Sequence, residues 1–171
     1  MRLGLCILFI VSFFVCAQDM LLYLRNSDII TRAQQQYGNE GHKRIKDWLN
    51  FIDDSADESE WKKIHLVNDF FNKHIKYKSD EDLWQQKDYW ATPLESLGVG
   101  MGDCEDYVIA KYFTLIALGV PEDKIRLMYV RQRTVNQPHM VLIYIEDPNR
   151  IPFVLGNFNT KLLPANKRPD L

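Results

Sequence analysis

The chain has 171 residues with a net charge of −2, and 46% of its residues are hydrophobic. This length and this hydrophobic content suffice for one globular domain with a buried core, and they argue against two domains. A nearly neutral charge without a basic stripe gives no support for a nucleic-acid partner.

The first 17 residues have the pattern of a secretory signal peptide. Arg2 supplies the positive start, an apolar run extends to Val15, and a small residue, Ala17, ends the predicted cleavage site. The run is shorter than the ~20 residues that a membrane span needs. We therefore expect a periplasmic mature protein of residues 18–171 without stable membrane insertion. An uncleaved anchor and a lipoprotein acylated on Cys16 are the alternatives.

Cleavage of this segment leaves a single cysteine, Cys104, because Cys6 and Cys16 both precede the cleavage site. One cysteine cannot form an internal disulfide, and an unpaired thiol in an oxidising compartment indicates a functional role. A buried, inert thiol in a structural protein is the alternative interpretation.

Helical spacing of apolar residues predicts three helical segments in the first half of the chain, at residues 28–37, 41–52 and 58–75. A short helix should follow at Pro93, because Thr92 is a typical N-cap and Glu95 completes a capping box. Beyond Pro121 the apolar pattern changes from the helical period to alternation. It predicts strands at residues 125–131, 139–145 and 151–155, with a hairpin turn at residues 147–150. Helices followed by a short antiparallel sheet define an α+β fold.

The block Gly102-Asp103-Cys104-Glu105-Asp106-Tyr107 places the cysteine on the first turn of an apolar-faced helix that ends near Gly119. A helix N-terminus carries unpaired N–H groups and partial positive charge, which lower the pKa of a thiol. The two flanking carboxylates repel a thiolate and therefore act in the opposite direction. They suit a helix N-terminus as capping groups, and they suit the binding of a cation that would cancel the repulsion.

His139 begins the second predicted strand, in the half of the chain that must pack on the cysteine helix. A cysteine on a helix and a histidine on a strand form the nucleophile and base of papain-like and transglutaminase-like enzymes. A histidine that caps a strand edge is the alternative interpretation.

Several motifs together resemble the bacterial transglutaminase-like cysteine proteinases. They are Trp90-Ala-Thr-Pro-Leu-Glu-Ser-Leu, the Gly102–Tyr107 block, Lys111-Tyr112 and Pro138-His-Met-Val-Leu. The resemblance extends from about Trp61 to the C-terminus. It implies a papain/transglutaminase-like fold in which the nucleophile helix packs on a short antiparallel sheet.

The resemblance also implies roles for individual residues. Cys104 is expected as the nucleophile, His139 as the general base, and Asp103 and Glu105 as calcium ligands, with Asp106, backbone carbonyls or water completing the metal site. Hard oxygen ligands suit calcium better than zinc or copper. The family further implies a large surface adhesin as substrate and an inner-membrane cyclic-di-GMP receptor as partner.

The third member of the family's triad is absent at its expected place. Members carry Val-Leu-Asp-Asn where this chain has Val154-Leu155-Gly156-Asn157. Asn157 is the predicted substitute, although neighbouring strand residues point to opposite faces, so that a local twist or bulge is required. Loss of the aspartate costs ~10⁴ in kcat in a serine triad, and less is expected for a thiol, which ionises more readily. The chain also ends at Leu171, where relatives continue into another strand, which suggests a truncated or divergent member.

Together with the N-terminal pattern, the resemblance implies an exported, calcium-dependent cysteine endopeptidase that cleaves a large cell-surface adhesin and controls biofilm attachment. A catalytically weak or inactive homologue that only binds adhesin or receptor is the first alternative, and Gly156 favours it. Another acyl transfer, such as transglutamination or peptidoglycan amide hydrolysis, is the second, because it would use the same attacking residues.

Overall fold

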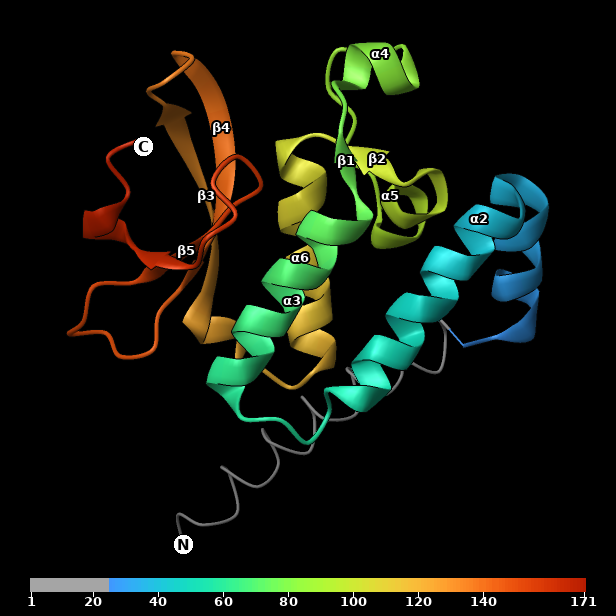
Figure 1. The fold of residues 1–171 in the computed structure, drawn as a ribbon, viewed down its shortest axis with the longest axis horizontal. Coiled ribbons are helices and arrows are strands. Elements are labelled where there is room, and N and C mark those ends of the chain that lie inside the picture. The colour runs from blue at the N-terminus through green and yellow to red at the C-terminus, as the bar shows by residue number, and fades with distance from the viewer. Residues whose placement is uncertain (1–24) are drawn as a thin grey trace, which may run out of the picture.

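The structure is a computed structural model that describes residues 25–171, so the predicted signal peptide lies outside the described residues. Helices make up the first part of the chain and the main sheet follows them (Figure 1). The helices are α2 (Ser27–Asp54), α3 (Glu60–His74), α4 (Asp80–Trp84), α5 (Pro93–Val99) and α6 (Cys104–Ala117), with the 3-10 turns η1 (Glu122–Lys124) and η2 (Ala165–Lys167). This order confirms the predicted α+β class.

The main sheet is antiparallel with the strand order β3-β4-β5-β6. Its strands are β3 (Ile125–Gln132), β4 (Gln137–Tyr144), β5 (Phe153–Leu155) and β6 (Leu163–Pro164). The sequence predicted the first three but placed His139 first in its strand, whereas β4 begins two residues earlier. Strand β6 was not predicted, because two residues are too few to show an alternating pattern.

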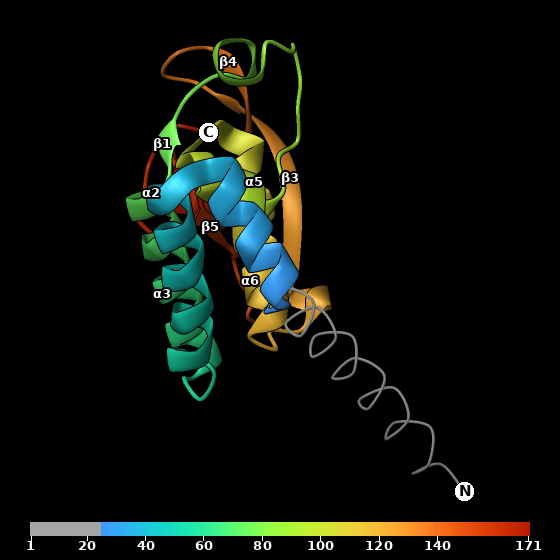
Figure 2. The same ribbon diagram turned by 90° about the vertical axis from the view of Figure 1, so that its right-hand side faces the viewer.

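Helix α6 is the central element of the fold. It lies between the sheet and helix α3, as the two perpendicular views show (Figures 1 and 2). Its apolar face belongs to one large core with α2, α3 and the facing side of the sheet, where Leu142 and Leu155 are fully buried. Trp48 of α2 donates to the Thr114 hydroxyl of α6 at 2.9 Å. Helix α6 is therefore held on both sides.

The start of α6 is positioned by a second set of contacts, which runs through α5. Helix α2 bends at Gly38, whose φ of 67° is left-handed, and then passes close to α5. A Cβ on Gly41 would lie 2.5 Å from the Gly98 carbonyl oxygen, so only glycine permits this approach. Arg44 donates to the Leu97 and Gly98 carbonyls, both at 2.6 Å. These bonds satisfy the end of α5 and hold the loop that leads to Cys104.

The predicted start of α5 and the predicted end of α6 are confirmed. Thr92 and Glu95 form the capping box of α5, with Pro93 in its first turn. Gly119 has a φ of +78° after the last turn of α6, and Val120 N–H donates to the Leu115 carbonyl. A parallel pair, β1 (Lys76–Tyr77) with β2 (Met101–Gly102), then anchors the glycine turn before Cys104. No helix in residues 25–171 is both long and apolar enough to cross a membrane.

Candidate active site

Cys104 is the first residue of α6, and its thiol faces the sheet. Pairing between β4 and β5 ends at Leu142 and Leu155, and beyond this pair the Met140 backbone N–H lies near the thiol, where it favours the thiolate. The thiol is half-buried and lies near the β4 backbone at Met140, the residue that follows His139. The predicted meeting of the cysteine helix with the histidine strand is present in the structure.

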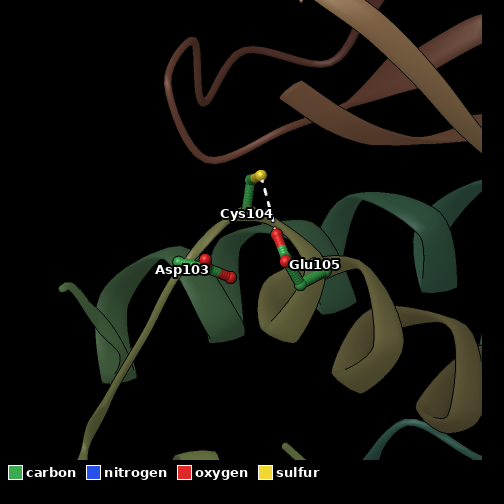
Figure 3. Close-up of side chains that lie close together, drawn as sticks. All are labelled: Asp103, Cys104 and Glu105. Atoms are coloured by element: carbon green, nitrogen blue, oxygen red, sulfur yellow. Dashed lines mark hydrogen bonds between the residues drawn. The ribbon is translucent and has the colours of Figure 1, made fainter. Parts of the chain in front are cut away.

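The thiol itself donates to the Glu105 carboxylate at 3.0 Å (Figure 3). Burial and this carboxylate raise the pKa of Cys104 above its ordinary value, and only the Met140 N–H opposes them. Among the described residues no hydrogen bond joins the thiol to His139. The arrangement thus stabilises the protonated thiol, and a thiolate requires that the negative charge beside it be reduced.

His139 is 6% exposed, and its Nε2 atom is buried without a hydrogen-bond partner in the described structure. Burial and the positive charge of Arg168 lower its pKa. Asn157, the predicted substitute for the missing aspartate, follows β5, and its Oδ1 is likewise buried and unpartnered. No described hydrogen bond links it to His139, so the structure shows no acid or amide that orients the imidazole.

Five carboxylates lie close together next to Cys104, those of Asp80, Asp88, Asp103, Glu105 and Asp106. Asp80 has carboxylate oxygens within 4.8 Å of oxygens of both Asp103 and Asp106, and a second group joins Asp80 with Asp88 and Glu105. None of the ion pairs among residues 25–171 includes them. One oxygen each of Asp80 and Asp103 is buried without any hydrogen-bond donor. Burial and the neighbouring carboxylates raise the pKa of both residues.

This donor set fits a hard cation. Buried carboxylate oxygens without donors are costly unless they bind a cation or become protonated, and calcium takes six to eight oxygen ligands. Asp103, Glu105 and Asp106 were expected here from the family resemblance, whereas Asp80 and Asp88 were not predicted. These two belong to a polar segment far from the cysteine block, and no spacing in the sequence relates the two segments.

Asp106 has a structural role that is independent of any metal. Its carboxylate accepts hydrogen bonds from the backbone N–H groups of Ala91 at 2.8 Å and Asp103 at 3.2 Å. It thereby joins the segment before α5 to the first turn of α6. Burial raises its pKa to about 7, and its side chain is inaccessible to solvent.

Asp106→Ala is therefore expected to destabilise the fold by about 2–3 kcal/mol, because two buried N–H groups lose their acceptor. Urea unfolding of the parent and the variant in chelator, where no metal contributes, measures this loss. Asp106→Asn retains one acceptor oxygen and should lose less. Equal stabilities of all three proteins in chelator would show that Asp106 has no structural role.

Comparison with known proteins assigns the family. Residues 35–169 match the family model of the bacterial transglutaminase-like cysteine proteinases. The chain belongs to this family. No curated protein sequence matches it. The mixed helix and sheet architecture is that of a transglutaminase-like fold, as the resemblance implied.

Solved structures of a family member are similar over most of the chain. Legionella pneumophila LapG is 38% identical with a TM-score of 0.72, over 83% of this chain and 80% of that one. Its calcium-bound structure is 40% identical with a TM-score of 0.73, over 84% and 79%. An EGTA-treated structure is 38% identical with a TM-score of 0.71, over 83% and 77%. Membership of a cysteine proteinase family agrees with the packing of α6, which begins with Cys104, against β4, which carries His139.

Proposed function

We propose that this chain is an exported, calcium-dependent cysteine endopeptidase that cleaves a large cell-surface adhesin and so controls biofilm attachment. The observation that carries the peptidase activity is the position of Cys104. It begins α6, and its thiol lies near the β4 backbone at Met140, the residue that follows His139. Membership of a cysteine proteinase family supports the same activity.

In this proposal His139 takes the proton of the Cys104 thiol, and the thiolate attacks the scissile carbonyl to form an acyl-enzyme. His139 then gives the proton to the leaving amine, and water hydrolyses the thioester. Backbone N–H groups at the start of α6 would stabilise the oxyanion, because the first N–H groups of a helix have no acceptor within the helix. The N–H of Cys104 is one of these groups.

Asp80, Asp88, Asp103 and Glu105 are the proposed calcium ligands, with Asp106 beside them. The unpartnered buried oxygens of Asp80 and Asp103 and the proximity of the other carboxylates support this assignment, as does the calcium-bound structure of LapG. Bound calcium would neutralise part of the negative charge that these residues place next to the thiol. Calcium binding would thus give a reason for the carboxylates that lie next to the proposed nucleophile, Cys104.

The cellular context follows from the family resemblance and the N-terminal pattern. The proposal includes removal of residues 1–17, a periplasmic location, an adhesin as substrate and an inner-membrane cyclic-di-GMP receptor as partner. Gly156 favours one other candidate, a homologue that binds these partners without cleaving, because no described side chain orients His139.

The test is cleavage of a purified adhesin fragment from the same organism by the mature chain with calcium present. Discrete products that mass spectrometry assigns to one peptide bond, and that are missing with Cys104→Ala, would support the peptidase. Tight binding of the fragment without products would favour the binding homologue. Product formation that requires an added amine would favour a transferase, because a peptidase needs only water.

A further inference from the structure

The backbone at residue 156 leaves room for a side chain that this chain does not have. An added Cβ would lie no closer than 3.6 Å to any neighbour, which is ordinary contact, and the φ of Gly156 is outside the left-handed region. Lys111, fully buried in α6, donates to the Gly156 carbonyl at 3.0 Å and holds the backbone there. Glycine at this position is thus required neither by space nor by backbone conformation.

The missing side chain would have three near neighbours. Its Cβ would lie 3.6 Å from the Asn159 carbonyl oxygen, 3.7 Å from Val141 Cγ1 and 3.8 Å from Arg168 Nη1. Val141 and His139 are two residues apart on β4 and therefore share one face of the sheet. A group at this place is consequently a diagonal cross-strand neighbour of His139, a separation that polar side chains can bridge.

Arg168 brings an unsatisfied buried donor to this place. Its side chain is 0% exposed. Nε and Nη2 donate to the Asp170 carboxylate at 2.8 and 2.7 Å, while Nη1 has no partner in the described structure. His139 Nε2 is the second buried nitrogen here without a partner. A guanidinium N–H without an acceptor and an imidazole nitrogen without a partner, both buried, suit an anion that would pair with Nη1 and with Nε2 in its protonated form.

No carboxylate near His139 in residues 25–171 is available to pair with it. The charged groups that act on it are Arg168, Asp170, Glu105 and Lys111. The carboxylate of Asp170 is already occupied by Arg168, with Gln132 Nε2 at 3.3 Å. Glu105 is bonded to the thiol. An imidazolium formed during catalysis would therefore face the Arg168 cation without a carboxylate of its own.

We propose that the niche formed by Gly156, Arg168 and His139 binds a small free carboxylate such as formate, which supplies the orienting charge that the chain itself lacks. One carboxylate oxygen accepts from Arg168 Nη1 and the other from His139 Nε2–H. The planar carboxylate matches such a pair of donors better than a spherical ion does. The role of this anion in orienting the base rests on the proposed function, whereas its binding does not.

The first experiment measures binding without reference to activity. The pKa of His139 is followed by NMR in the intact mature chain at constant ionic strength, with and without sodium formate. Formate is expected to raise it by about one unit or more, because an opposite charge at hydrogen-bond distance favours the imidazolium. His42, His65 and His74 serve as internal controls and should not change.

Two variants at the same position provide matched controls. Gly156→Ala fills the niche with a methyl group and should abolish the response to formate. Gly156→Asp should raise the pKa of His139 without formate and also lose the response. An unchanged His139 in the parent, an equal response to chloride, or a parent-like response in Gly156→Ala would overturn the proposal.

The second experiment follows the rate of Cys104 alkylation and, where cleavage occurs, of cleavage. Formate should raise both rates in the parent by about tenfold, which corresponds to one pKa unit, and should not raise them in Gly156→Asp. If formate raises the pKa of His139 but no cleavage occurs, the proposed peptidase activity is contradicted and the proposed anion site is supported. Cleavage by a parent whose His139 ignores formate would overturn the anion site alone.

Discussion

Cys104→Ala is expected to abolish cleavage, with a loss in kcat on the order of 10⁶-fold, because the acyl-enzyme can no longer form. His139→Ala should lower kcat by ~10²–10⁴-fold, since the thiol loses its proton acceptor while the attacking atom remains. Initial rates on the adhesin fragment at saturating calcium measure both losses. Circular dichroism and thermal unfolding confirm that the variants remain folded.

His74→Ala is the matched control for the histidine. His74 ends α3, where its Nδ1 lies 2.8 Å from the Phe70 carbonyl oxygen, and it belongs to no part of the proposed site. Its replacement should leave cleavage within about twofold of the parent. Comparable losses in His139→Ala and His74→Ala would remove His139 from the mechanism. An active Cys104→Ala would remove the cysteine.

Removal of calcium is expected to lower the reactivity of Cys104 by about tenfold or more at pH 7. Without a cation, burial and the Glu105 carboxylate raise the pKa of the thiol, so the thiolate fraction at neutral pH is small. Each unit of pKa changes this fraction about tenfold. The rate of alkylation by iodoacetamide, measured against pH in calcium and in EGTA, reports the shift directly. In calcium the rate should reach its plateau at lower pH.

The ligand assignment is tested by Asp80→Asn and Asp103→Asn, which keep the shape of each side chain and remove one charge. Both should raise the calcium concentration needed for half-maximal reactivity, and both should reduce the stabilisation against heat that calcium provides, about 2.7 kcal/mol at 100 times Kd for the parent. Asp82→Asn changes an aspartate of α4 outside the cluster and should respond like the parent. Identical calcium dependence in all four proteins would contradict the site.

Local patterns were sufficient for much of the fold. Thr92, Pro93 and Glu95 specify the start of α5, and Gly119 specifies the end of α6, because capping depends only on residues within one turn. The apolar period likewise located α3, α6, the two parts of α2 and the three longer strands, whereas α4, β1 and β2 were not predicted. The strand boundaries and β6 were less predictable, since short pairings depend on neighbours that are distant in sequence.

The residue types around the nucleophile were also predictable from the sequence. The block that contains Cys104 combines a glycine turn, a helix N-cap and two flanking acids within six residues, so that its chemistry is local. The choice of His139 among four histidines followed from its strand and from the family resemblance. Its place on the strand that meets the thiol agrees with that choice.

The environment of these residues was decided by the tertiary structure alone. Asp80 and Asp88 join the carboxylate cluster because β1 pairs with β2, which brings the α4 segment next to the cysteine turn. Arg168 reaches the face of His139 because the end of the chain packs against the sheet, where Arg133 N–H donates to the Asp170 carbonyl. The sequence by itself determined which atoms can react, since reactivity depends on residue type and local caps. Apart from Asp103 and Glu105, which adjoin Cys104, the charges that act on those atoms come from segments distant in the sequence, which only the packed chain brings together.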